Sequence, residues 1–149
     1  MIRMLIQLVV SFFATISFAV LFNVPKKEFF YCGMTGVIGW FFYQLIFDSM
    51  HSVVFANFIS SVVITVVSRL FAVNRKLPVT IFLISGIFPL VPGAGIYYTT
   101  YYIITNEITL AVSKGVETIG IALAIAFGIM LVFLIPQKLF LFGKNQKAK

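Results

Sequence analysis

Charged residues are scarce in this sequence. Lysine, arginine, aspartate and glutamate make up 10% of its 149 residues, whereas a soluble domain carries about 25%. Hydrophobic residues account for 61% of the chain, and the mean hydropathy is +1.09. This composition excludes water as the solvent of most of the surface, and it predicts an integral membrane protein with a single membrane domain over residues 1–149.

Side chains that catalyse reactions or bind metals are also few. His51 is the only histidine and Cys32 the only cysteine, so an intramolecular disulfide is excluded. No spacing predicts a metal site or a nucleophile beside its base, and no Walker motif is present. The sequence therefore predicts neither an enzyme nor a bound cofactor or metal. The four carboxylates are dispersed along the chain: Glu28, Asp48, Glu107 and Glu117.

Long apolar runs dominate instead. Each has the length that a helix needs to cross the hydrocarbon core of a bilayer. Because backbone polar groups must find partners inside a membrane, such runs predict helices. We expect an all-α fold of about five transmembrane helices, followed by a basic cytoplasmic tail at residues 136–149. The predicted spans are residues 4–22, 29–47, 52–71, 79–105 and 118–135.

The basic residues are distributed unevenly between the two sides that five crossings define. The loop at 23–28, the loop at 69–78 and the tail hold nine of the eleven lysines and arginines. We expect the protein to lie in the plasma membrane. The positive-inside rule then places its N-terminus outside the cell and its C-terminus in the cytoplasm. This topology explains the net charge of +7 better than a nucleic-acid surface does.

The fourth run carries a helix-breaking motif at residues 89–95. Pro89 and Pro92 cannot donate backbone hydrogen bonds, and Gly93 and Gly95 follow them within a stretch, 77–106, that has no charge. We expect the fourth helix to break there, at the middle of the bilayer. A break at that depth must be buried in protein or line a wet cavity, and broken helices hold the substrates of many transporters.

A helix that restarts near Gly93 would present free N–H groups and a positive dipole end to a carboxylate. The tyrosines that follow would supply hydroxyls, and a polar stripe on the third span, which includes Asn57 and Ser61, would face protein or water. The alternatives are a kink used only for packing and hydroxyls bonded to their own helix. The predicted substrate-binding residues are Pro89, Pro92, Gly93, Ala94, Gly95, Tyr97, Asn57 and Ser61.

Small residues recur on two of the spans. Gly120, Ala124 and Gly128 lie four residues apart and predict a face on which another span or another subunit packs closely. A weaker pattern in the second span, residues 33–39, has glycine at every third position. That pattern has an equally good explanation in the general abundance of glycine in membrane helices.

Two passages resemble a known family. Phe22-Asn23-Val24-Pro25 and the run from Phe88 through Pro89-Leu90-Val91-Pro92-Gly93-Ala94-Gly95 to Tyr97 are similar to the small membrane subunit of the split threonine/serine exporter (ThrE) family. The similarity extends over nearly the whole chain in length, segment count and motif order. It implies export of threonine and serine together with a larger ThrE-type membrane subunit that carries a soluble domain, in the lipid bilayer.

Other functions stay open at this point. Some members of the family are linked to succinate export, and a dicarboxylate also presents a carboxylate to a helix start. A non-transporting scaffold subunit would use its glycine face to bind another protein, and a channel would carry flux without ion coupling. The sequence therefore predicts a small carboxylate substrate without naming it.

Overall fold

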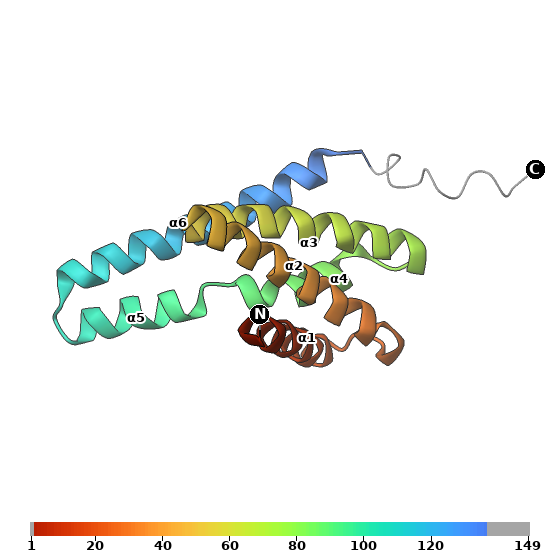
Figure 1. Ribbon diagram of the computed structural model, residues 1–149, viewed down its shortest axis with the longest axis horizontal. Helices are drawn as coiled ribbons and strands as arrows, with labels where there is room; N and C mark the ends of the chain where they lie inside the picture. Colours follow the sequence, from red (N-terminus) through yellow and green to blue (C-terminus); the bar gives the residue numbers. More distant parts are fainter. Residues whose placement is uncertain (1, 137–149) are drawn as a thin grey trace, which may run out of the picture.

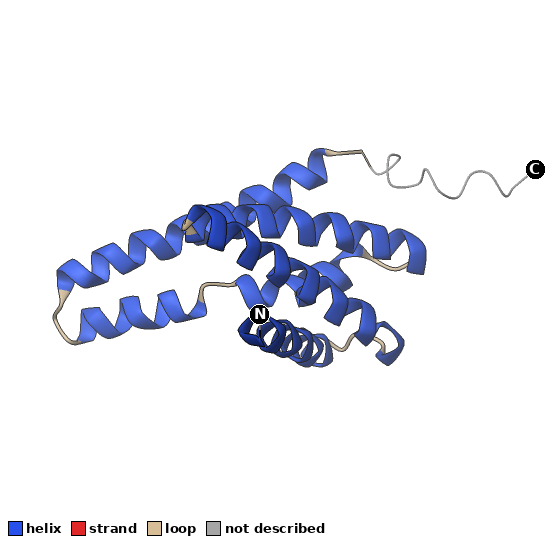
Figure 2. Cartoon of the chain, viewed as in Figure 1, coloured by secondary structure: helices blue, strands red, loops and turns tan. Residues whose placement is uncertain are grey.

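Helices make up the computed structural model, which describes residues 2–136 (Figure 1). No strand occurs within those residues (Figure 2). The basic tail predicted at 136–149 lies outside them, apart from Pro136. In chain order the elements are α1 (Ile2–Leu21), the 3₁₀ helix η1 (Lys26–Glu28), α2 (Phe29–Met50), α3 (Val53–Arg75), α4 (Val79–Ile87), the 3₁₀ helix η2 (Phe88–Leu90), α5 (Gly93–Ile104) and α6 (Ile108–Leu134).

The predicted membrane spans are confirmed as helices. Within the described residues, α1, η1 with α2, α3 and α6 are each long and apolar enough to cross a membrane. A fifth candidate span is bent by 46° where Val79–Leu90 meets Gly93–Ile104. The chain is thus an all-α, multi-pass membrane protein whose fourth span is broken at the predicted motif.

The last helix begins earlier than the sequence predicts. The fifth span was expected to start at residue 118, whereas α6 starts at Ile108 and continues unbroken to Leu134. Lys114 and Glu117, expected in an outer loop, therefore lie on the helix. The reason is physical: no proline interrupts residues 108–118, and the two opposite charges are three residues apart, a spacing that a helix tolerates well.

Contacts at glycines show that α6 runs parallel to α3. A Cβ added at Gly120 would lie 3.5 Å from Val54, and one at Gly128 would meet Ser61. Because α3 and α6 point the same way, both begin at the same end of the bundle. The chain between them, α4 and α5, must therefore run back across the bundle once. The bent pair is therefore one crossing and not a re-entrant loop.

One end of the bundle gathers the segments that the charge pattern had assigned to a common side. Arg75, at the end of α3, forms an ion pair of 2.7 Å with Glu28, which follows α1. Arg69 donates through Nη1 to the carbonyl of Ile135 at 2.8 Å, beyond the end of α6. The loop at 23–28, the end of α3 and the end of α6 thus lie together, as predicted.

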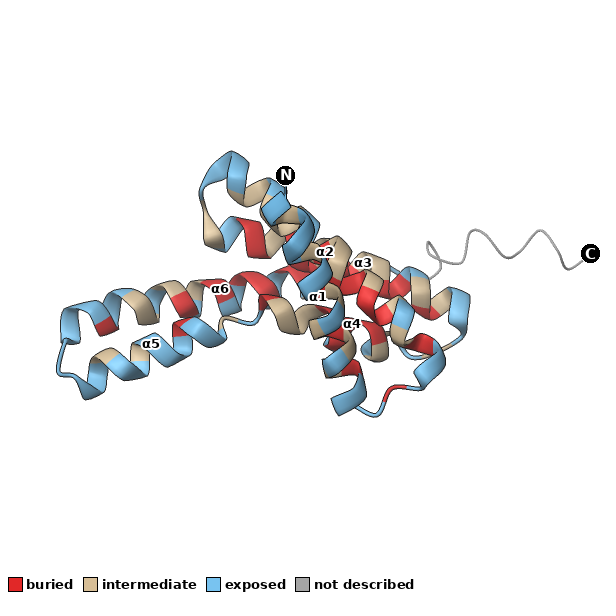
Figure 3. Ribbon diagram, turned by 60° about the horizontal axis from the view of Figure 1, so that its bottom comes forward, coloured by how far each residue is buried: buried red, intermediate tan, exposed pale blue. Residues whose placement is uncertain are grey.

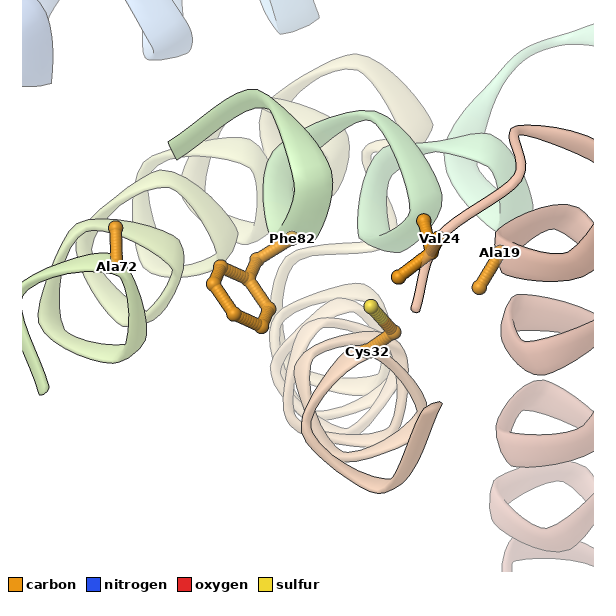
Figure 4. Close-up of a cluster of buried hydrophobic side chains, with 5 residues drawn as sticks. All are labelled: Ala19, Val24, Cys32, Ala72 and Phe82. Carbon is orange, nitrogen blue, oxygen red and sulfur yellow. The ribbon is translucent and has the colours of Figure 1, made fainter. Parts of the chain in front are cut away.

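A small apolar core lies close to this end. Phe82 of α4 and Cys32 of α2 are fully buried there, beside Ala72 of α3 and the Ala19 and Val24 pair around the end of α1 (Figure 4). Four segments meet here around Phe82, and the other residues of the cluster are small. The close approach that results holds α4 against α2 and α3 and so determines where the broken span enters the bundle.

Both glycine patterns are packing faces. Gly128 packs against Ser61 and the carbonyl of Phe58, while Ala124 is buried on the same side of α6. The weaker pattern in α2 also has neighbours, because Gly36 contacts Thr15 of α1 and Gly39 contacts Ile64 of α3. The prediction of a close packing surface for another span is confirmed, and the partner of this face of α6 is α3.

The far end of the molecule is less covered. α5 and the first turns of α6 form a hairpin that projects beyond the other helices (Figures 1 and 3). Gly95 of α5 packs against Thr118 of α6, and Gly115 of α6 lies beside Thr99 of α5. Exposed apolar side chains cover most of the rest of this hairpin, among them Ile96, Tyr97, Ile103, Ile104, Ile108 and Val112.

Candidate functional site

The break in the fourth span is a short connection between two helices. α4 passes into η2, and Val91 and Pro92 separate η2 from α5. The N–H of Val91 donates to the carbonyl of Phe88 at 3.1 Å, which closes η2. The ring of Phe88 stacks on that of Phe18 in α1, with ring centroids 4.1 Å apart. The first side of the break is therefore anchored in the bundle.

A cavity of about 330 Å³ opens at this break. That volume is at the lower end of the range of roughly 300–1,000 Å³ in which proteins bind small molecules. Four helices and the break surround it. Its lining residues are Trp40 and Tyr43 of α2, Val53 and Asn57 of α3, residues 89–95, Tyr98 of α5, and Lys114, Glu117, Thr118 and Ile121 of α6.

The beginning of α5 offers unused backbone donors to this cavity. No side chain in the described part of the chain caps α5, whose N-cap residue is Pro92. The first hydrogen bond of the helix runs from the N–H of Ile96 to the carbonyl of Pro92, at 3.1 Å. The amides of Ala94 and Gly95 precede it and belong to the first helical turn, where N–H groups lack partners within the helix. Such a turn attracts an anionic group.

The two glycines of the motif have different surroundings. A Cβ at Gly95 would collide with Oγ1 of Thr118, so this glycine permits α5 to pack against α6. At Gly93 an added Cβ meets no atom within 4 Å. Gly95 therefore has a packing role, and Gly93 borders open space at the cavity. Of these two glycines, Gly93 is the one at which an added side chain would enter open space without disturbing the helix pair.

Two polar side chains of α2 and α3 complete the wall opposite α5. Asn57 is 3% exposed and donates through Nδ2 to the carbonyl of Val53 at 2.8 Å. No described residue donates to its Oδ1. The indole N–H of Trp40 is buried and has no hydrogen-bond partner within the described part of the chain. A buried indole N–H usually has an acceptor, so this donor is an exception on a residue that lines the cavity.

An ion pair lies on the α6 wall. Nζ of Lys114 is 2.7 Å from Oε2 of Glu117, and both side chains are roughly one-third exposed. Among the described residues, these are the only charged ones that line the cavity. They are also the only charges between residues 108 and 137. Sequence reasoning had placed them in a loop. Two features of the sequence could have indicated that they lie on a helix: the opposite charges are spaced at i and i+3, and no helix breaker interrupts the run.

The structure brings six of the eight predicted substrate-binding residues to this cavity: Pro89, Pro92, Gly93, Ala94, Gly95 and Asn57. Ser61 does not line it, because its hydroxyl donates to Phe58 and faces Gly128 in the α3–α6 contact. Tyr97 does not line it either and is 64% exposed, whereas its neighbour Tyr98 is a lining residue. Trp40 was missed, although it is the only tryptophan in the chain.

The position of the break along the bundle follows from how α4 packs on α3. Gly86 already contacts Ile64 at the middle of α3. The residues after Gly86 run on toward the beginning of α3, where Val53 and Asn57 share the cavity with the break. The break therefore lies nearer to one end of the bundle than to its centre, because α4 packs along only the later half of α3.

Within the described residues no group of three or more histidine, cysteine or carboxylate side chains could hold a metal ion. The chemistry available at the cavity is recognition by hydrogen bonds and charge: free amides at the start of α5, an amide oxygen, an indole N–H, an ammonium and a carboxylate. Together these groups can bind a small polar solute.

A comparison with protein families gives one match. The model of the family described as Threonine/Serine exporter, ThrE, matches residues 7–135. Neither the curated proteins nor the solved structures include a match to the chain. The matched region contains α1 from residue 7 onward, the other four spans and every residue that lines the cavity.

Proposed function

Because the chain belongs to the threonine/serine exporter family, we propose that it is the membrane subunit of a two-component secondary exporter whose substrates are threonine and serine. Family membership supports membrane transport of the exporter type, and the helices are those of a multi-pass membrane protein. The cavity at the break is the substrate site in this proposal. We likewise propose the identity of the substrates and the presence of a second component.

One observation supports the location of the site above the others. The break interrupts the helical hydrogen bonds at residues 89–95, and some backbone groups there have no partner within the helix. The cavity lies beside these residues. A break that served only to bend the span would be expected to close on itself or on neighbouring side chains. Here the residues of the first turn of α5 and Trp40, whose indole N–H has no partner within the described residues, line the same space.

The exposed apolar surface supports a partner. In the most apolar stretch of α1 only 17% of the residues are buried, and the hairpin of α5 and α6 projects with exposed isoleucines and tyrosines (Figure 3). Lipid covers part of such a surface in a membrane. We propose that a larger ThrE-type membrane subunit with a soluble domain covers another part, and co-purification from membranes tests this.

Orientation follows from the charge asymmetry. We propose that the N-terminus is outside and that the end carrying Lys26, Lys27 and Arg75 faces the cytoplasm of the plasma membrane. Cys32 is fully buried, so introduced cysteines can be labelled against a low background. In intact cells a membrane-impermeant maleimide should label Glu107→Cys but not Lys27→Cys. The reverse pattern contradicts this orientation.

Transport of labelled solutes tests the function. Cells that contain this chain with the larger subunit should export labelled threonine and serine, and cells with either chain alone should not. Export of succinate without threonine or serine would favour the dicarboxylate alternative. A complex that assembles but moves none of these solutes would favour a scaffold and contradict the proposal.

A further inference from the structure

We propose that Lys114 and Glu117 recognise the two opposite charges of a zwitterionic amino acid, and that this ion pair excludes dicarboxylates from the cavity. The inference rests on the proposed function and assigns to the site a pair of specificity-determining residues on α6. Its starting point is the contact of 2.7 Å between Nζ of Lys114 and Oε2 of Glu117, on the wall that faces the break.

The position of the pair is unusual for a helix of this composition. No other charge occurs in α6, and most of the side chains around the pair are apolar. Placing charges in an apolar span is costly, and such charges commonly mark a substrate or ion pathway. A solvated pair at i and i+3 stabilises a helix only weakly, so stability alone gives little reason for it.

A zwitterion fits the pair because the charges balance. The carboxylate of an amino acid can take the place of Glu117 as a partner of Lys114, and its ammonium can take the place of Lys114 as a partner of Glu117. Binding then replaces one ion pair by two, and the net charge within the cavity remains zero. Charge-assisted hydrogen bonds of this kind are the strong ones in protein sites.

The rest of the lining agrees with this division of roles. The indole N–H of Trp40 and the first-turn amides of α5 are donors, which suit a carboxylate. Oδ1 of Asn57 is an acceptor that no described residue uses, and it suits an ammonium or a hydroxyl group. The side-chain hydroxyl that threonine and serine share can therefore find a partner in the same cavity.

A dicarboxylate such as succinate has the wrong charges for this wall. It carries two carboxylates, whereas the cavity offers one ammonium and one carboxylate. One end of the solute would lie near Glu117, and a buried or half-buried like-charge contact is unfavourable. The pair thus distinguishes between the two substrate classes that a helix N-terminus alone accepts equally.

The test compares competitors that each lack one charge. Vesicles that contain the complex are loaded with labelled threonine, and unlabelled threonine, 3-hydroxybutyrate or threonine methyl ester competes for transport. 3-Hydroxybutyrate lacks the ammonium, and the methyl ester lacks the carboxylate. The wild-type protein should prefer threonine to each analogue by about tenfold or more, which is the discrimination expected when a charged partner is left unpaired.

Each variant should lose one preference. Glu117→Gln should reduce the preference over 3-hydroxybutyrate to about twofold, and Lys114→Gln should do the same for the methyl ester. Glu107→Gln removes an exposed carboxylate at the tip of the hairpin and is the control, with both preferences unchanged. Variants that transport threonine with both preferences intact would overturn the inference while leaving the exporter function in place.

A charge exchange separates recognition from a merely structural ion pair. The double variant Lys114→Glu with Glu117→Lys retains two opposite charges at the same spacing but reverses them relative to Trp40 and α5. We expect threonine transport to remain about tenfold or more below that of the wild type. Recovery of wild-type transport would show that the pair only stabilises the helix. A wild-type complex that moves no amino acid would instead contradict the proposed function.

Discussion

Arg75 binds the carboxylate of Glu28 through two parallel hydrogen bonds, from Nε at 2.9 Å and from Nη2 at 2.7 Å. The Glu28 side chain is 6% exposed, and the guanidinium of Arg75 also lies over the ring of Tyr31, at 4.8 Å. Residues 47 positions apart are thus joined in a bidentate pair. This contact fastens the loop between the first two spans to the end of the third.

Loss of the Glu28 carboxylate should therefore weaken the fold. Glu28→Gln leaves Arg75 without its charged partner and should lower the melting temperature of the protein in detergent. Lys26→Gln, in the same loop but exposed, is the matched control and should melt with the wild type. Equal melting temperatures for all three proteins would show that the pair contributes nothing to stability.

The α3–α6 contact gives a second prediction, on packing. A Cβ at Gly128 would lie 2.9 Å from the carbonyl oxygen of Phe58 and even closer to Ser61. Gly128→Ala should therefore lower the free energy of unfolding by about 1–3 kcal/mol. Gly120→Ala, in the same motif, meets Val54 at an ordinary 3.5 Å and should change it by less than about 0.5 kcal/mol. Denaturant unfolding in detergent measures both, and equal losses would contradict the contact geometry.

Arg69 should hold the end of α6. It donates through Nη1 to the carbonyls of Val132 and Ile135, and its side chain is buried. Arg69→Met keeps much of the apolar stem and removes the donors. We expect faster hydrogen exchange in the last turns of α6, with exchange in α1 unchanged. If the last turns of α6 exchange at the same rate in the variant and in the wild type, other contacts hold the helix end.

Trp40 tests the donors of the cavity. Trp40→Phe keeps an aromatic ring and removes an N–H that no described residue accepts. If that group binds the substrate, the threonine concentration for half-maximal transport should rise about two- to tenfold, the effect of one lost hydrogen bond. Tyr98→Phe removes a hydroxyl from the same lining and provides a comparison. An unchanged concentration dependence for Trp40→Phe would remove Trp40 from the site.

The sequence allowed the main features of the fold to be predicted because their causes are local. Proline cannot donate at positions 89 and 92, so the break follows from the residues alone. Small residues at 120, 124 and 128 leave one helix face bare, and that face packs closely against α3. Basic loops are similarly visible in the sequence, and the structure places them at one end.

What could not be predicted depends on tertiary packing. The position of the break along the bundle depends on how α4 packs on its neighbours, including the contact of Gly86 with Ile64, which no local pattern indicates. Lys114 and Glu117 resemble the residues of a solvated loop when hydropathy alone is considered, and only the fold brings them to the break. Ser61 and Tyr97 have suitable chemistry, but the rotation of their helices directs one toward Gly128 and exposes the other.

The central claim is that the cavity at the break holds the substrate, and Gly93 tests it most directly. A Cβ there meets no described atom within 4 Å, so we expect Gly93→Leu to fold and assemble, whereas Gly95→Leu would collide with Thr118. The measurement is export of labelled threonine by the assembled complex that contains Gly93→Leu. We predict a loss of about tenfold or more, with Gly93→Ala closer to the wild type. Wild-type export by Gly93→Leu would contradict a substrate site at this break.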